Sequence, residues 1–227
     1  MSVNVEVVRV FCDDEGGFGN ELGIVESSAD TEGREQAIAR ELGFSETVFV
    51  DEVSDGVATV RIFTPAMELP FAGHPSVGTA WWLGSTGRPV RILREKAGEV
   101  TVRADAADPA MVSIGAHASW APSFDWAELA SEAEVDALDP ADYSGDHGYF
   151  YAWLDESTGS LRSRMFAPVM GIVEDEATGA AAVALTGRLE RDLTIRQGRG
   201  SRIATTYLGE GRVEVGGRTV FDRTIAV

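Results

Sequence analysis

The chain has 227 residues, 44% of them hydrophobic, so it can bury a large core as one big domain or two small ones. Its formal net charge is -18, which makes nucleic acid an unsuitable partner, because binding to phosphates requires a positive surface. One cysteine, no signal-peptide pattern, and no apolar run long enough for a bilayer lead us to expect a cytoplasmic protein without disulfides or a membrane partner.

Patterns of apolar and turn-forming residues predict mostly strands in the first half of the chain. Thr31 is placed to cap a helix that runs to Leu42 and ends at Gly43. An apolar pattern resumes over 20–27, and residues 75–83 are expected to form a buried helix. The expected strands are 5–11, 45–50, 57–64, 90–93 and 100–103.

The second half shows the same mixture of many strands with few helices. Residues 122–138 are acidic and expected to be helical in their middle, and 178–189 should form a second buried helix. The segment 104–109 is the candidate crossover between the halves. The expected strands are 111–114, 149–154, 163–166, 193–197, 203–208, 213–215 and 219–227. One short buried helix in each strand-rich half predicts an α+β architecture.

A seven-residue phrase occurs twice. Residues 61–67 and 164–170 agree at four of seven positions with an offset of 103, and each copy leads through a polar loop into small and apolar residues. This spacing is too long for a solenoid and indicates a duplicated domain, with chance similarity as the alternative. We predict an N-terminal domain over 1–108, completed by 219–227, and a C-terminal domain over 109–218.

A glycine lies at the start of each predicted buried helix, with Gly73 just ahead of the first and Gly179 within the first turn of the second. A helix N-terminus offers unpaired N–H groups and a partial positive charge, and glycine lets a ligand approach the backbone closely. Two such junctions across a cleft would suit a small molecule bearing a carboxylate. The plainer interpretation is that the glycines and Thr178 only cap buried helices.

His74 lies at the first of these junctions and not on a periodic apolar face. This position favours a histidine that relays a proton, with a buried core histidine as the alternative. The other histidines, His117 and His147, have no metal-ligand spacing with it, so we expect no metal site.

Two carboxylates are candidates for acid–base chemistry. Glu46 precedes the apolar run 48–50, where partial burial would raise its pKa; an exposed strand residue is the alternative. Asp175 lies between two other acidic residues and is otherwise interpreted as a solvated acidic turn. The chain lacks the sequence patterns of a serine nucleophile elbow and of a phosphate-binding loop.

Taken in order, these phrases resemble the phenazine-biosynthesis PhzF-like family over most of the chain. The most specific phrase is Glu-Leu-Pro-Phe-Ala-Gly-His-Pro at 68–75, together with Ser-Glu-Thr at 45–47. The other matching stretches are 10–11 with 19–20, 44–49, 61–65, 171–175 with 177–179, and 197–198 followed by Arg202.

The resemblance implies a diaminopimelate-epimerase-like fold of two pseudo-symmetric domains, each a curved, mostly antiparallel sheet around a central helix, with the active site between them. It implies an isomerase resembling trans-2,3-dihydro-3-hydroxyanthranilate isomerase, without a cofactor and commonly a homodimer. By this analogy Glu46 moves a proton between carbons, while His74 and Asp175 bind the substrate and assist the relay. The residues implied to bind the substrate are Asn20, Ser45, Gly73, Thr178, Gly179 and Ala180.

Epimerases of this fold use two cysteines, and neither loop has one here, which favours a single carboxylate base. Two alternatives stay open. One is an epimerase or tautomerase that uses the same base. The other is a non-catalytic protein that binds small acids, suggested by Ala180 in place of a common serine and by a shortened segment between 104 and 162.

Overall fold

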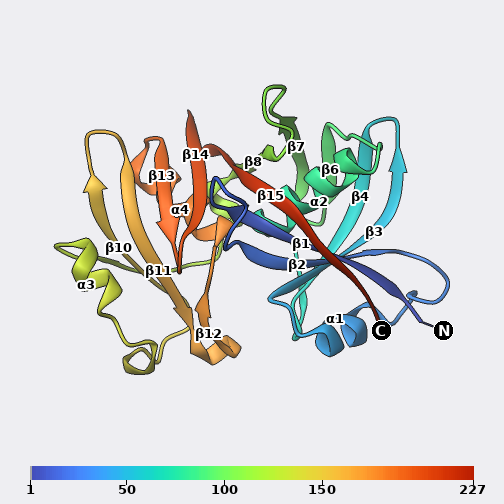
Figure 1. Cartoon of the computed structure of the whole chain (residues 1–227), viewed down its shortest axis with the longest axis horizontal. Coiled ribbons are helices and arrows are strands. Elements are labelled where there is room, and N and C mark those ends of the chain that lie inside the picture. The colour runs from blue at the N-terminus through green and yellow to red at the C-terminus, as the bar shows by residue number, and fades with distance from the viewer. Residues whose placement is uncertain (1) are drawn as a thin grey trace.

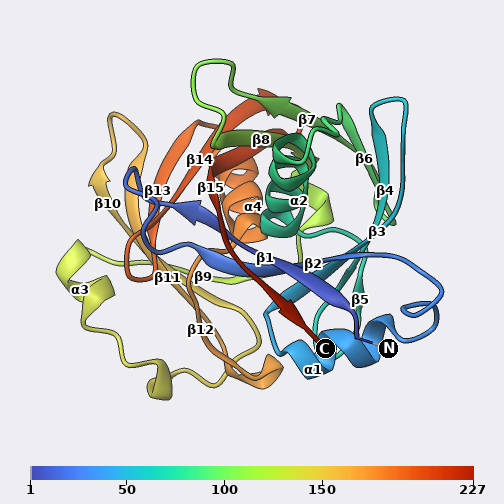
Figure 2. The same ribbon diagram turned by 45° about the vertical axis from the view of Figure 1, so that its right-hand side comes forward.

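The computed structural model describes residues 2–227 and contains two halves, each a curved sheet wrapped around one helix (Figure 1). The two central helices, α2 (Gly73–Ser85) and α4 (Gly179–Leu189), lie side by side in the middle of the molecule (Figure 2). The described strands form one continuous sheet. The predicted α+β class with two similar halves is therefore confirmed.

In the first half the sheet closes into a ring around α2. The elements are β1 (Asn4–Cys12), β2 (Asn20–Glu26), α1 (Glu35–Leu42), β3 (Glu46–Ser54), β4 (Val57–Phe63), β5 (Glu68–Leu69), β6 (Ile92–Glu95), β7 (Gly98–Ala104), β8 (Met111–His117) and β15 (Arg212–Ala226). The order is β1-β2-β3-β4-β6-β7-β8-β15, and β15 pairs back to β1. The β2–β3 and β4–β6 pairs are parallel.

In the second half the sheet continues from β15 around α4. The elements are β9 (Asp125–Glu128), α3 (Glu132–Asp136), β10 (Gly148–Asp155), β11 (Ser160–Ala167), β12 (Ile172–Asp175), β13 (Leu193–Gln197) and β14 (Ser201–Gly209), with 3-10 turns at 118–120, 140–142 and 168–170. The order is β15-β14-β13-β11-β10-β9. Here the β9–β10 and β11–β13 pairs are parallel.

The two halves repeat one pairing scheme. In each, a long strand is followed by a short antiparallel partner, a central helix and a parallel strand: β4-β5-α2-β6 and β11-β12-α4-β13. The repeated phrase also makes the same contacts, because the guanidinium carbon lies 4.9 Å from the phenylalanine ring centre in both copies. The arginine of each copy pairs with a glutamate on the short strand. These ion pairs are Arg61–Glu68 and Arg164–Glu174. The phrase therefore marks a structural duplication.

β15 takes part in both halves. It pairs with β14 of the second half, and in the first half its residues 212–218 pair with β8 and its residues 218–226 pair with β1. β8, which lies beyond the predicted boundary at 108, packs against α2 and completes the first ring. The sheet therefore runs without a break from one half to the other, and the predicted division at 108 stays a prediction.

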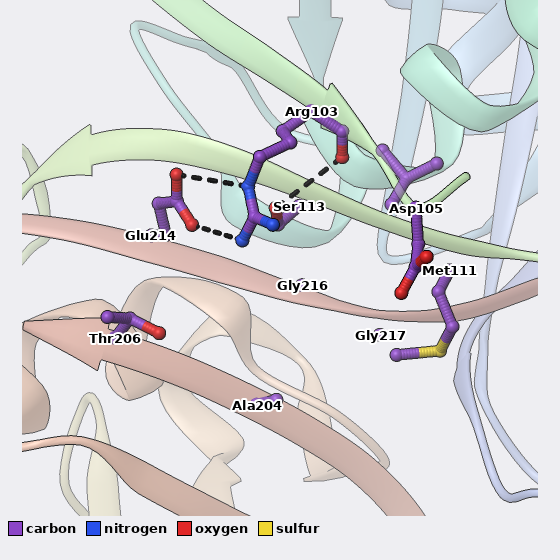
Figure 3. Close-up of a pocket in the computed structure, with 10 residues that line it drawn as sticks. Arg103, Asp105, Met111, Ser113, Ala204, Thr206, Glu214, Gly216 and Gly217 are labelled. Carbon is purple, nitrogen blue, oxygen red and sulfur yellow. Dashed lines mark hydrogen bonds and ion pairs between the residues drawn. The ribbon is translucent and has the colours of Figure 1, made fainter. Parts of the chain in front are cut away.

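Glycines allow β15 to pass closely between its neighbours. A methyl group on Gly216 would lie 2.6 Å from the carbonyl oxygen of Val112, and one on Gly217 would lie 2.7 Å from Cδ1 of Phe11. A cavity of about 120 Å³ lies on this face of the sheet, where a paired arginine and glutamate of β7 and β15 border it (Figure 3). That ion pair is Arg103–Glu214.

α1 begins later than predicted, at Glu35. The hydroxyl of Thr31 serves the preceding turn instead, because it accepts from the N–H of Ser28 at 2.8 Å and donates to the carbonyl of the same residue at 3.0 Å. Arg34 occupies the N-cap position of α1, and its side chain makes no capping hydrogen bond. The predicted end at Gly43 is confirmed, with φ of 69° and its N–H bonded to the last turn.

The acidic stretch 122–138, predicted to be helical in its middle, forms a strand followed by only a short helix. It contains strand β9 and then the short helix α3, which Ser131 caps by accepting from the N–H of Glu134 at 3.3 Å. β9 pairs in parallel with β10 just as β2 pairs with β3. The pairing of this segment within the duplicated sheet therefore determines its conformation more than its acidic composition does.

α2 is buried on almost every side because it lies inside the ring. A methyl group on Gly78 would lie 2.6 Å from Cδ2 of Leu22, so the helix can approach the sheet only with a glycine there. α2 also starts two residues earlier than predicted, which places Gly73 and His74 in its first turn. In residues 2–227 no helix has the length and apolar character needed to cross a membrane.

Candidate active site

The first residues of α2 and α4 touch each other. A methyl group on Gly73 would lie 2.9 Å from the carbonyl carbon of Gly179, and one on Gly179 would lie 2.8 Å from the backbone nitrogen of His74. Neither N-cap residue, Ala72 or Thr178, makes a side-chain cap. The two converging N-termini therefore offer backbone N–H donors and positive potential suited to an anion.

Glu46, the first residue of β3, faces His74. Its Oε2 lies 3.3 Å from Nδ1 of the imidazole and has no hydrogen-bond partner within residues 2–227. Burial raises the pKa of Glu46 to about 7, and burial lowers the pKa of His74 to about 4. At neutral pH a neutral imidazole therefore contacts a carboxyl group that gains and loses its proton.

The tautomer of His74 follows from its second contact. Nε2 lies 3.4 Å from the backbone carbonyl oxygen of Glu21. A carbonyl oxygen only accepts, so when Glu46 is protonated Nε2 carries the hydrogen and Nδ1 of the neutral ring is left as an acceptor. Nδ1 can thus receive a hydrogen bond from Glu46 when that carboxyl group is protonated.

Asp175 is held by a network from both halves. Nδ2 of Asn20 donates to Oδ1 at 2.6 Å, and the Thr178 hydroxyl donates to Oδ2 at 2.5 Å. Gln197 Nε2 in turn donates to the Thr178 hydroxyl at 2.8 Å. Burial raises the pKa of Asp175 to about 6, and the nearby charge of Glu46 raises it further against these hydrogen bonds. The two carboxyl groups therefore titrate as an interacting pair.

A cavity of about 1110 Å³ opens between the halves beside these groups. One wall includes the turn 64–67, which ends the first copy of the repeated phrase. The opposite wall includes 169–173, which contains the end of the second copy and the residues that follow it. Ser45 and Asp175 line the cavity, whereas the cavity of Figure 3 contains no predicted site residue. Glu46 does not itself line the cavity, but its side chain is 18% exposed and the neighbouring residue Ser45 is part of the cavity wall.

The structure brings the predicted site residues together around the two helix starts. They are Glu46, His74, Asp175, Asn20, Ser45, Gly73, Thr178, Gly179 and Ala180. The Thr178 hydroxyl donates to Asp175 and accepts from Gln197. The Ser45 hydroxyl has no partner in the described part of the chain. The catalytic and binding roles of these residues stay predictions.

The sequence patterns did not indicate two groups of residues that lie near the site. Gln197 orients Thr178, and nothing in its local pattern indicates this. Glu95 and Ser76 form a buried pair behind the start of α2. A signal existed for Glu95, because it lies two positions after an apolar residue in a short strand and so shares its buried face.

Comparison with solved structures identifies the class to which this fold belongs. A PhzF family protein of Enterococcus faecalis has a TM-score of 0.76 at 19% identity, with 100% of this chain and 99% of that chain covered. A probable proline racemase of Agrobacterium radiobacter has a TM-score of 0.69 at 12% identity, covering 99% and 92%. The fold is thus shared by PhzF proteins and by a racemase, and the predicted resemblance is confirmed.

Sequence comparison identifies the family. The model described as phenazine biosynthesis-like protein matches residues 8–153 and 127–214. A trans-2,3-dihydro-3-hydroxyanthranilate isomerase of Pseudomonas aeruginosa is 32% identical, covering 80% of this chain and 78% of that protein. An uncharacterized isomerase of Deinococcus radiodurans is 28% identical, covering 88% and 82%. This chain belongs to the phenazine biosynthesis-like family, and the predicted isomerase class is confirmed.

Proposed function

We propose that this protein is a cofactor-independent isomerase that moves a proton within a small carboxylate-bearing ring substrate of the trans-2,3-dihydro-3-hydroxyanthranilate type. The observation that carries the proposal is the contact of Glu46 with neutral His74 beside the two facing helix N-termini. The Pseudomonas relative named for that reaction supports the substrate class.

In this proposal the substrate carboxylate accepts hydrogen bonds from the backbone N–H groups of Gly73, Gly179 and Ala180. Ionised Glu46 removes a proton from a ring carbon, and the electron pair of the broken C–H bond enters a shifted carbon–carbon double bond. Protonated Glu46 then returns the proton to the carbon at the other end of the shifted system. Atoms and electrons balance within the substrate, so the step consumes no oxidant or reductant.

His74 and Asp175 assist this transfer. Nδ1 of His74 accepts from Glu46 while that group holds the proton, which keeps the carboxyl oriented between the two half-reactions. Asp175, fixed by Asn20 and Thr178, faces the cleft and binds a donor group of the substrate. A thiol-based two-base reaction is not supported, because Cys12 is buried and burial raises its pKa to about 11.

The protein is further proposed to act in the cytoplasm and as a homodimer, as is common for the family that the sequence resembles. Sedimentation equilibrium tests the dimer, and a purely monomeric species at micromolar concentration would contradict it.

Proton NMR in D₂O with trans-2,3-dihydro-3-hydroxyanthranilate tests the reaction. The expected result is isomerisation with deuterium at the new position, lost in Glu46→Gln. Exchange with inversion at a single carbon would indicate an epimerase instead. Binding of the compound without exchange or turnover would indicate a non-catalytic acid-binding protein and overturn the proposal.

A further inference from the structure

Glu95 is a buried acid that the reaction proposed above does not use. It ends β6, is 6% exposed and contacts none of the groups to which the reaction assigns a role. Its Oε1 lies 2.5 Å from the hydroxyl oxygen of Ser76 in α2. Its Oε2 has no hydrogen-bond partner in the part of the chain that the structure describes. A carboxylate in such a place is costly unless it is neutral.

The hydroxyl of Ser76 indicates where the proton lies. Its oxygen is 2.7 Å from the carbonyl oxygen of Ala72 as well as 2.5 Å from Glu95. The hydroxyl has one hydrogen and the carbonyl can only accept, so a hydroxyl that donates to Ala72 must itself accept from protonated Glu95. Burial raises the pKa of Glu95 to about 8, in agreement with a neutral group at pH 7.

The chain of donors ends on the peptide group between Ala72 and Gly73. A hydrogen bond to the carbonyl of a peptide polarises it and strengthens the N–H on its other side, here that of Gly73 at the meeting point of the helices. Ionised Glu95 would also place a negative charge at the start of α2, where it would compete with a bound anion for the same positive potential.

We propose that Glu95 is a positioning residue whose protonated form, acting through Ser76 and the Ala72 carbonyl, prepares the Gly73 N–H to bind the substrate carboxylate. The part of this inference that concerns the substrate rests on the proposed function. The relay itself is a property of the protein alone.

α4 provides an internal comparison. The first turns align from Gly73 and Gly179, so Ala182 takes the place of Ser76. The N–H of Ala182 bonds the carbonyl of Thr178 at 3.1 Å, and no side-chain hydroxyl is available there. A buried helix of this fold therefore begins without such a pair, which argues that Glu95 and Ser76 serve more than helix formation.

The charged groups on the elements around Glu95 are engaged elsewhere. They are Arg61 and Lys96 with Glu68, Arg94 with Glu99, Arg103 with Glu214, and His74 with Glu46. Within residues 2–227 no ion pair joins any of them to Glu95. Burial therefore governs its titration.

Amide NMR of the unliganded protein tests the relay. The Gly73 N–H signal should titrate between pH 6.5 and 9.5 with a midpoint near pH 8 in the wild type, and this step should disappear in Glu95→Gln, whose amide still donates to Ser76. Ser76→Ala should shift the signal upfield at every pH. Thr79→Val is the matched control, because Thr79 is a buried α2 residue whose hydroxyl has no partner in the described residues. An unchanged titration in Glu95→Gln would overturn the proposal.

Binding of anthranilate tests whether protonated Glu95 strengthens carboxylate binding at Gly73. It is measured in a Glu46→Gln background, which removes the titration of the proposed base. Its Kd should weaken by about 5-fold from pH 7 to 9.5, and the loss should be absent when Glu95→Gln is added. Equal pH dependence in both variants would overturn the role of Glu95. Failure of anthranilate to bind either variant at any pH contradicts the proposed carboxylate site and with it the substrate role of Glu95, while the amide titration decides the relay separately.

Discussion

Nδ1 of His74 lies 3.3 Å from Oε2 of Glu46, and the opposite ring nitrogen faces a backbone carbonyl that favours a hydrogen on Nε2 when Glu46 is protonated. The contact therefore joins an acceptor nitrogen to a carboxyl group whose pKa burial raises to about 7. Such an acid can take a proton and return it near neutral pH, as a single-base isomerase requires.

Replacing Glu46 by glutamine should reduce turnover by at least about 100-fold, equivalent to roughly 2.7 kcal/mol in the barrier, because the amide cannot take a proton. In the wild type, kcat/KM should rise with pH around a midpoint near 7 as Glu46 ionises. Rates measured from pH 5.5 to 8 check both statements. Full activity in Glu46→Gln would remove the residue from the mechanism.

Stability should depend on pH through the same group. The pKa of Glu46 is higher in the folded than in the unfolded chain, so its contribution is complete below the unfolded pKa and is lost as pH rises through 7. Relative to Glu46→Gln, the wild type should lose about 1 kcal/mol between pH 6.5 and 8. Urea unfolding at both values measures this. The lowered pKa of His74 affects the stability of both proteins, so its contribution cancels when wild type and Glu46→Gln are compared.

The contact between the two helix starts should tolerate no side chain. Gly73→Ala or Gly179→Ala should abolish detectable turnover and cost about 1–3 kcal/mol of stability, since the added methyl meets rigid backbone. Gly84→Ala is the control in the same helix, because nothing lies within 4 Å of its added methyl. That variant should gain up to about 1 kcal/mol from helix propensity and keep full activity. Thermal unfolding together with rates distinguishes the two outcomes.

The hydroxyl of Thr178 should act through Asp175. Thr178→Val removes a 2.5 Å hydrogen bond that holds the carboxylate, so the pKa of Asp175 should rise further and turnover should fall by about 10-fold. The exposed residue Thr194 provides a control, and Thr194→Val should change neither property. A shifted acid limb in the pH–rate profile marks the electrostatic effect, whereas an unshifted profile with lower stability would indicate a structural role only.

The sequence predicted the duplication because the phrase that begins at Arg61 recurs at Arg164. In the structure these two arginines make the same local contacts. It also placed the site residues, since glycines and titratable residues at helix starts are visible as a pattern. It did not predict β9, whose acidic residues are poor strand formers and are fixed only by pairing with β10. Nor did it find Gln197 or Ser76, because their partners lie on distant elements.

β15 has a consequence for biosynthesis. β1 is made first, yet one of its two sheet partners is residues 218–226, which leave the ribosome more than 200 positions later. The ring around α2 therefore cannot close before β15 has left the ribosome. We expect the first half to stay open and exposed to chaperones until β15 has been synthesised, and then both halves to consolidate in one cooperative step.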